Sequence, residues 1–392
     1  MTAAGAAMFG VYLLVLALSA AIALGATLAA WLATTRCQAT ALFAVRGPHE
    51  RPRWGGAVIF LSFACTPFVA SMISADAAGF FRPRSGEFAG FLAAAMLIFL
   101  VGLFDDLRIA TWQQKVAVEV AAAVAVYAAG YRMDRIGFPW GPEVDLRWAG
   151  FGVTVLWVLF FTNALNLIDG RDGLATGVGA LAAVTLAAIG ASAHHPAVAL
   201  LLVALAGAQL AFLPFNLPPA SLYIGDSGAL LLGFVLGSLS VRATTGATSA
   251  VFIAVTAVAL AYPLLDAALA AVRRVLDGRH PFLGDQDHIH HRLEEAGFGP
   301  RGILLVTWGL SGLFSAGALL LHYVDWFVSE ALVLLAVAGL VTFVLTRLGY
   351  IASLWNSRAV VAVRMRVSVP DGASTASPSP TTATTAPADG DS

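Results

Sequence analysis

The feature that most constrains this chain is a series of apolar stretches, each about 20 residues long, separated by short polar segments. A helix of that length crosses the hydrocarbon core of a bilayer. Hydrophobic residues make up 59% of the chain and charged residues only 11%, more apolar surface than a soluble fold could bury. The stretches number eleven, or ten if the two that meet at His194 form one: 8–31, 55–75, 87–104, 114–130, 150–167, 174–192, 197–215, 228–245, 250–272, 302–322 and 326–347. We therefore predict an all-α polytopic integral membrane protein.

Basic residues are distributed unequally between the two sides that these spans define. Sixteen Lys and Arg residues fall in connections on one side and six on the other. Cytoplasmic loops of membrane proteins carry the excess of Lys and Arg. We therefore expect the richer side to be cytoplasmic, with the N-terminus outside and the C-terminus inside. The formal net charge of −1 and the lack of a basic tract give no indication of nucleic-acid binding.

Composition divides the chain into three parts. Residues 1–355 carry the spans and form the predicted transmembrane domain, and residues 356–366 form a basic cytoplasmic juxtamembrane segment. Residues 367–392 consist mainly of Ser, Thr, Pro, Ala and Gly, which cannot bury enough apolar surface to order themselves. We expect this last part to be a disordered tail.

Nearly all the acids and histidines that could do chemistry lie in polar stretches at the ends of predicted spans. There are five such stretches: 49–56, 102–106, 163–173, 225–229 and 285–292. If the spans cross alternately, all five emerge on the side assigned to the cytoplasm. Ionisable groups are costly in a membrane and usually mark a functional site. Their collection on one face predicts an active site, and so an enzyme.

Asp105 and Asp106 end the third span. Adjacent carboxylates repel each other, and a divalent cation or a cationic substrate would neutralise them. Successive helical residues point about 100° apart, so the two acids are expected to have different roles. A solvated loop in which Arg108 pairs with an acid is the alternative.

Asn163, Asn166 and Asp169 are spaced by three residues, which places them on one stripe of a helix. Asp172 follows in a glycine-rich turn. Such a stripe leading into a turn could hold a phosphate-bearing ligand and its metal ion. Hydrogen bonding between helices by the amides is the structural alternative.

A second glycine-rich turn, Gly225-Asp226-Ser227-Gly228, directly precedes the eighth span. Unpaired N–H groups at a helix N-terminus attract anions. An acid in that position is better explained as a metal ligand beside a phosphate than as a phosphate contact. A plain N-cap by Asp226 or Ser227 is the alternative.

His288, His290 and His291 precede Arg292 in a polar loop. Zinc is one possible ligand, but the set lacks the His-Glu-x-x-His spacing of metalloproteases and contains no cysteine. Imidazoles beside an arginine suit a diphosphate better. A separate acid, Asp266, falls inside the ninth span and must face the bundle, for structural pairing or for function.

Taken together, these motifs resemble those of the polyprenyl-phosphate N-acetylhexosamine-1-phosphate transferases, which include phospho-N-acetylmuramoyl-pentapeptide transferase. The resemblance covers about residues 45 to 300. It rests on the aspartate pair, the Asn-x-x-Asn-x-x-Asp-Gly-x-Asp-Gly block, the Gly-Asp-x-Gly turn, the His-Ile-His-His-Arg loop and an upstream His-x-x-Pro-x-x-Gly-Gly segment that begins at His49. Ala229 stands where the family's turn has serine. The histidine pattern is similar to that of the branch that uses UDP-GlcNAc.

The resemblance implies transfer of a sugar phosphate from a UDP-N-acetylhexosamine to polyprenyl phosphate, with release of UMP. It assigns catalytic roles to Asp105, Asp106 and Asp169. Mg²⁺, or Mn²⁺ in its place, would be held by Asp226 with Asp169 or Asp106. Donor and acceptor contacts would come from His49, Asn163, Asn166, Asp172, His288, His290, His291 and Arg292. The expected location is a bacterial cytoplasmic membrane, with the site facing the cytoplasm and a homodimer possible.

Four other functions stay open at this stage. Within the family, the chain could transfer phospho-muramoyl-pentapeptide for peptidoglycan synthesis. Outside it, the polar loops could form the vestibule of a transporter for an anionic solute, although such a protein needs ionisable groups near mid-membrane. A zinc-dependent hydrolase built on the three histidines and a non-catalytic scaffold are the remaining possibilities.

Overall fold

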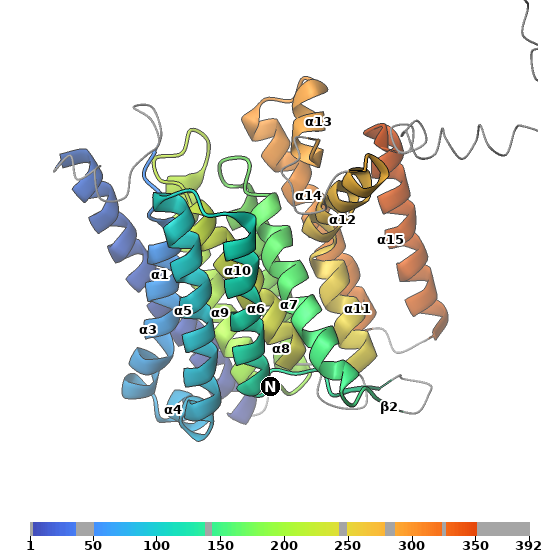
Figure 1. Ribbon diagram of the computed structural model, residues 1–392. Helices are drawn as coiled ribbons and strands as arrows, with labels where there is room; N and C mark the ends of the chain where they lie inside the picture. Colours follow the sequence, from blue (N-terminus) through green and yellow to red (C-terminus); the bar gives the residue numbers. More distant parts are fainter. Residues whose placement is uncertain are drawn as a thin grey trace, which may run out of the picture.

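The computed structural model describes residues 3–36, 51–137, 143–242, 249–278, 287–323 and 327–350. These residues are almost entirely helical, and the helices lie side by side in a bundle (Figure 1). A two-stranded antiparallel ribbon, in which Arg135 pairs with Asp145, connects two of the helices. The predicted all-α membrane architecture is confirmed at this level. The predicted basic segment 356–366 and the tail 367–392 lie outside the described residues.

Each of the eleven predicted spans overlaps a helix. The elements are α1 (Ala3–Arg36), α3 (Gly55–Ile73), α4 (Ala75–Phe81), the 3-10 helix η1 (Arg82–Arg84), α5 (Ser85–Leu107), α6 (Trp112–Ala128), β1 (Arg135–Ile136), β2 (Val144–Asp145), α7 (Ala149–Leu167), α8 (Leu174–Ser192), α9 (Pro196–Asn216), α10 (Gly225–Arg242), α11 (Ser249–Ala259), α12 (Ala261–Leu276), α13 (Ile289–Glu295), α14 (Pro300–Tyr323) and α15 (Phe327–Arg347).

Within the described ranges, seven helices are long and apolar enough to cross a membrane. The predicted span 250–272 is not one straight helix, because it breaks at Leu260 into α11 and α12, whose axes differ by 82°. Counting this bent pair as one span gives up to eight. The three remaining predicted spans correspond to α6, α10 and α15, of 17, 18 and 21 residues, which are not among the seven.

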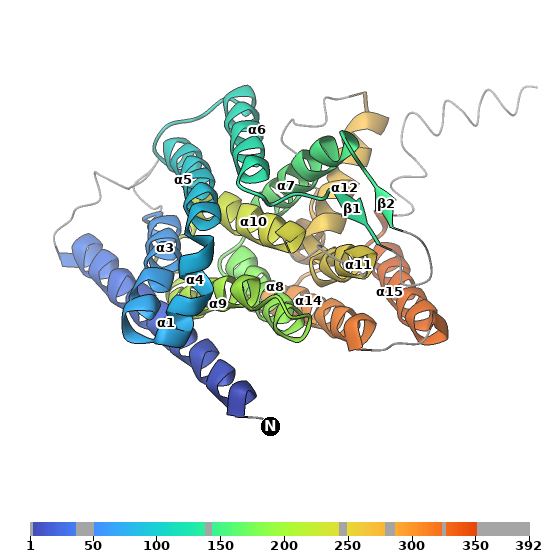
Figure 2. The ribbon, with the colours of Figure 1, turned by 90° about the horizontal axis from the view of Figure 1, so that it is seen from below.

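Helix α10 lies inside the bundle and contacts α3, α5, α7 and α8 (Figure 2). Every residue from Ser227 to Val241 is buried. Small residues allow this close packing, as is common between membrane helices. A Cβ built on Gly233 would lie 2.3 Å from the carbonyl oxygen of Phe161 in α7, and one built on Gly102 in α5 would lie 2.4 Å from the Cα of Ser227.

Chain direction decides which helix ends meet. The C-terminal ends of α5 and α7 and the N-terminal end of α10 lie at one end of the bundle, together with α13, at the top of Figure 1. The helix α4 and the start of α5 lie at the opposite end. Segments that are more than a hundred residues apart in the sequence are therefore neighbours.

The contact between α5 and α10 predicts a strong effect of adding one methyl group. We expect Gly102→Ala to lower the melting temperature of the detergent-purified protein, because the new Cβ meets backbone atoms of α10 rather than a flexible side chain. Overpacking of this kind costs about 1–3 kcal/mol. Gly152→Ala in α7 is the matched control, since no atom lies within 4 Å of its Cβ position. Equal melting temperatures for the two variants would contradict the close α5–α10 contact.

Candidate active site

Asp106, at the end of α5, holds the N-terminus of α10. Its Oδ1 accepts a hydrogen bond from the backbone N–H of Asp226 (2.9 Å), and its Oδ2 accepts one from that of Ser227 (3.0 Å). The Arg53 guanidinium lies 3.2 Å from Oδ1. Gly225 has a φ of +72°, and a Cβ there would lie 2.6 Å from Asp106 Oδ2. Because the first amides of a helix lack partners within it, this buried carboxylate stabilises the start of α10.

Lys115, near the start of α6, lies between two carboxylates. Its Nζ is 3.1 Å from Asp105 Oδ2 and 2.7 Å from Asp226 Oδ2. The other oxygen of Asp105 accepts a hydrogen bond from the N–H of Ala110 at 2.7 Å. One ammonium group thus joins the ends of α5, α6 and α10. Burial, together with the hydrogen bond to Asp105, raises the pKa of Asp226 to about 6, although Lys115 opposes the rise.

Asp169 lies beside this cluster, in the turn between α7 and α8. Burial raises the pKa of Asp169 well above its ordinary value, and the charges of Asp226 and Asp106 add to the rise. A cavity of about 270 Å³ opens here, and its lining includes Asp169, Asp172, Asp226 and Arg53. Carboxylates from two turns therefore face one small polar cavity, where a cation would relieve their mutual repulsion.

Asp172 and Asn216 fix the backbone around this cavity. Asp172 Oδ2 accepts a hydrogen bond from the N–H of Ala220 at 3.0 Å. Asn216 Oδ1 accepts bonds from the N–H of Gly173 (3.2 Å) and the hydroxyl of Thr176 (2.7 Å). Asp172, predicted to bind substrate, thus also has a structural contact that ties the α7–α8 turn to the segment before α10.

The two asparagines of the predicted stripe have different surroundings. The Asn163 amide donates to Glu119 Oε2 at 2.6 Å and to the carbonyl of Leu159 at 3.0 Å. This is the helix–helix hydrogen bonding that was the structural alternative for this residue. Asn166 Oδ1 is buried and has no hydrogen-bond partner among the described residues. It is the asparagine with an acceptor still to be satisfied.

Asp266 positions the histidine loop. Its Oδ2 lies 2.7 Å from His288 Nδ1, and its Oδ1 accepts a hydrogen bond from the N–H of Ile289 at 2.8 Å. Asp266 is completely buried and His288 is 5% exposed. The sequence left open whether Asp266 has a structural or a functional role, and in the structure this acid anchors the first turn of α13.

His290 packs against the turn that carries Asp169. A Cβ on Gly170 would lie 2.5 Å from His290 Nε2, so a larger residue at this contact would displace the His290 ring. His290 is 1% exposed, and neither ring nitrogen has a hydrogen-bond partner among the described residues. Burial, with a smaller contribution from His291, lowers the pKa of His290 to about 3. The ring is therefore neutral near pH 7 and can supply a hydrogen bond rather than a positive charge.

Arg292 is held mainly by protein groups. Its Nε and Nη2 donate to the Asp287 carboxylate at 2.6 and 2.5 Å, and its Nη1 donates to the carbonyl of Leu348 at 2.7 Å. The guanidinium carbon lies 3.8 Å from the centre of the Tyr350 ring. Arg292 thus fastens α13 to the end of α15, and two of its five N–H donors remain for a ligand.

The structure brings most of the predicted residues to one end of the bundle. Asp105, Asp106, Asp169 and Asp226 form one group, and His290 joins the histidine loop to it through Gly170. His49 lies outside the described residues. Within the ranges described, no three His, Cys, Asp or Glu side chains form a preformed metal cage.

The sequence did not identify Arg53, Lys115 or Glu119 as site residues, although each contacts a predicted one. Lys115 is the only lysine in the chain, and it begins a predicted span, which is a signal that could have found it. Glu119 follows four residues later within the same apolar stretch and is 1% exposed. An acid at that depth needs a partner, but the sequence does not reveal that the partner is Asn163.

Known proteins resemble this chain over the segment that carries the aspartates. A family model described as glycosyl transferase family 4 matches residues 88–244, a segment that contains all four clustered aspartates. The chain is 30% identical over 279 residues to the probable undecaprenyl-phosphate N-acetylglucosaminyl 1-phosphate transferase of Bacillus subtilis, covering 70% of this chain and 75% of that protein.

Two further relatives show the same range of similarity. The chain is 32% identical over 333 residues to the decaprenyl-phosphate N-acetylglucosaminephosphotransferase of Mycobacterium tuberculosis, covering 76% of this chain and 81% of that protein. It is 30% identical over 282 residues to the phospho-N-acetylmuramoyl-pentapeptide-transferase of Pelotomaculum thermopropionicum, covering 66% and 85%.

The raised pKa of Asp226 predicts how stability depends on pH and on divalent cations. Because the folded state holds this proton more tightly than the unfolded chain, the Asp226 contribution to stability falls as pH rises from about 4 through about 6. A cation bound by the ionised carboxylate would offset this loss. We expect Mg²⁺ to raise the melting temperature more at pH 7.5 than at pH 5.5.

Asp226→Asn is the control for that measurement. The variant should lose most of the pH-dependent response to Mg²⁺, and in EDTA at pH 7.5 it should be at least as stable as the parent. A response to Mg²⁺ that is the same at both pH values, or unchanged in the variant, would contradict the assignment.

Proposed function

The chain belongs to the family of polyprenyl-phosphate sugar-1-phosphate transferases, glycosyl transferase family 4, and we propose that it transfers GlcNAc-1-phosphate from UDP-GlcNAc to polyprenyl phosphate. The products are GlcNAc-diphosphoryl-polyprenol and UMP. The observation that carries this function is the cluster of four aspartates at one helix end beside a polar cavity, within the segment shared with the family. In a bacterial cell this would be the first membrane step in the synthesis of an envelope polysaccharide.

Transfer forms a bond between an oxygen of the polyprenyl phosphate and the β-phosphorus of the donor. The bond from that phosphorus to the oxygen bridging the two donor phosphates breaks, and UMP leaves with its electron pair. Such transfers depend on alignment and charge neutralisation more than on covalent help from the protein. A phosphate monoester has a second pKa near 6, so the acceptor needs little help to lose its proton at pH 7.

The residues around Lys115 would bind and orient the acceptor phosphate. Asp105 is the proposed acceptor-side acid, and it is held by Lys115 and by the N–H of Ala110. Lys115 offers an ammonium group to a phosphate oxygen, in addition to its present role between two carboxylates. Burial, with the neighbouring charges of Asp226 and Asp106, raises the pKa of Asp169, which suits either a proton acceptor or a nucleophile in a two-step reaction.

The chemistry of the carboxylate cluster fits Mg²⁺, with Mn²⁺ as a substitute. Mg²⁺ usually binds through one or two carboxylates, substrate phosphates and water, so a preformed cage of three side chains is not required. We propose Asp226 and Asp169 as its ligands, with Asp106 as a further candidate that mainly holds α10. When bound, the ion would neutralise the charge of the donor diphosphate.

The histidine loop would bind the donor. His290 and His291 supply neutral imidazoles next to the Asp169 turn, and Asp266 holds His288 in position. Arg292 contributes its remaining N–H donors. Asn166, whose amide oxygen has no partner among the described residues, is a candidate contact to the sugar or nucleotide. Asn163, Asp172 and His49 complete the proposed substrate-binding set.

The membrane gives a reason for this arrangement. An acceptor with a long polyprenyl chain must approach from the lipid, while a sugar nucleotide is water-soluble and comes from the cytoplasm. We propose ten or eleven spans in residues 1–355, with the N-terminus outside, the C-terminus inside and the carboxylate cluster facing the cytoplasm. The proposed location is a bacterial cytoplasmic membrane, and a homodimer is the proposed assembly.

The proposed reaction predicts UMP release by the detergent-purified protein when undecaprenyl phosphate and UDP-GlcNAc are both present. Release should require the lipid and Mg²⁺ and should stop in EDTA. UDP-GalNAc and UDP-muramoyl-pentapeptide are the comparison donors. Faster release with the pentapeptide donor would assign the chain to peptidoglycan synthesis instead. If a sample with a normal melting transition released no UMP with any donor, the transferase function would be ruled out.

Lys115→Met should lower UMP release by about tenfold or more, the loss expected when a preorganised charge is removed from a phosphoryl-transfer site. The concentration of Mg²⁺ needed for half-maximal release should also fall, because Asp105 and Asp226 would attract the cation more strongly without the ammonium group. Lys115→Arg keeps the charge and is the matched control. Full activity in Lys115→Met would contradict the role given to this lysine.

A further inference from the structure

A second pocket lies at the end of the bundle opposite to the aspartate cluster. Its volume is about 230 Å³, and it is lined by Tyr131 and by residues of α4, η1, α5, the α8–α9 turn, α9 and the end of α10. Glu87, in its lining, and Asp106 are nineteen residues apart on α5, about 28 Å at 1.5 Å per residue. That distance approaches the thickness of a bilayer's hydrocarbon core, about 30 Å. We call this site the Arg84–Arg242 pocket.

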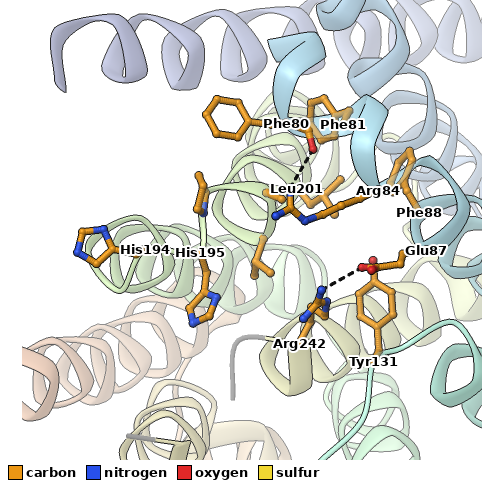
Figure 3. A pocket seen from close by; sticks show the side chains of 13 residues that line it. Phe80, Phe81, Arg84, Glu87, Phe88, Tyr131, His194, His195, Leu201 and Arg242 are labelled. Carbon is orange, nitrogen blue, oxygen red and sulfur yellow. Dashed lines mark hydrogen bonds and ion pairs between the residues drawn. The ribbon is translucent and has the colours of Figure 1, made fainter. Parts of the chain in front are cut away.

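Positive groups exceed negative groups in this pocket. Two arginines, Arg84 and Arg242, stand against one acid, Glu87, which lies 3.0 Å from the Arg242 guanidinium. The Arg84 guanidinium donates to the carbonyl of Phe80 at 3.5 Å, and it is not paired with a carboxylate among the described residues (Figure 3). His194 and His195 belong to the same lining.

His195 has basic neighbours in this pocket. Burial lowers the pKa of His195, and Arg242 and His194 lower it further. His195 also precedes the first turn of α9, where the helix dipole adds partial positive charge. The groups that face His195 therefore favour an anion in the pocket.

The rest of the lining consists of aromatic residues and of the aliphatic residues Pro196, Ala197, Val198 and Leu201. Phe80, Phe81, Phe88 and Tyr131 contribute rings, and Phe81 and Phe88 lie 6.1 Å apart between ring centres. Arginines beside aromatic rings at the end of membrane-spanning helices form an amphipathic environment typical of headgroup depth. Trp148 is 88% exposed and precedes α7, whose first turn lies at the same end of the bundle as α4 (Figure 1).

We propose that the Arg84–Arg242 pocket binds the phosphate of an anionic membrane lipid, with the Phe80 and Phe81 rings beside its acyl chains. A phosphodiester would accept charge-assisted hydrogen bonds from Arg84 and His195 and would compete with Glu87 for Arg242. The lipid would connect η1 to the α8–α9 turn. Nothing in the transfer reaction requires this site, which lies at the other end of α5 and α10.

Native mass spectrometry of the full chain tests this binding without any sugar nucleotide. Phosphatidylglycerol should bind more tightly than zwitterionic phosphatidylcholine. Arg84→Gln should weaken the tightest phosphatidylglycerol binding by about tenfold, as expected for the loss of a charged hydrogen bond. Arg135→Gln is the control, because Arg135 is an exposed arginine at the same end that does not line the pocket.

Glu87→Gln should strengthen lipid binding, a result that misfolding would not produce. It frees the Arg242 guanidinium, so phosphatidylglycerol should bind several-fold more tightly than in the parent. The lipid site would be ruled out by unchanged affinity in Arg84→Gln and Glu87→Gln, or by an equal loss in Arg135→Gln. Displacement of the lipid by an equal concentration of inorganic phosphate would instead identify a site for soluble anions and overturn the lipid proposal.

Discussion

The active-site end of this protein depends on the two hydrogen bonds that Asp106 accepts from the first amides of α10. They fix the α10 N-terminus against the end of α5, and so they set where the Asp226 side chain projects. The close backbone contact at Gly102 makes this arrangement possible, because a larger residue would push α10 away. Asp106 therefore positions Asp226, while its neighbour Asp105 contacts Lys115.

Charge balance explains why the cluster can exist at a membrane surface. Four aspartates meet near one cavity, and Lys115 with Arg53 provides only part of the compensating charge. Burial, together with the neighbouring carboxylates, raises the pKa values of Asp169 and Asp226. Such a site costs stability when it is empty of cations, and the same property makes it receptive to a cation and to phosphate.

Burial and hydrogen bonds within the protein organise the histidine loop. Asp266 holds His288, and Arg292 spends three of its N–H donors on Asp287 and Leu348. His290 is left as a neutral ring pressed against Gly170. Groups that looked alike in the sequence thus divide into those that build the loop and those that remain for a ligand.

The sequence by itself determined the apolar helices, the polar stretches at their ends and the family motifs, because hydrophobic length and residue type are local properties. It also placed Asp105, Asp169, Asp226 and His290 in one predicted site. Only the tertiary structure decided that Asp106 anchors α10, that the single lysine joins Asp105 to Asp226, that Glu119 binds Asn163 and that the span 250–272 bends at Leu260. Those roles depend on which side chains from distant segments come within hydrogen-bond distance, and packing of the whole bundle sets that distance.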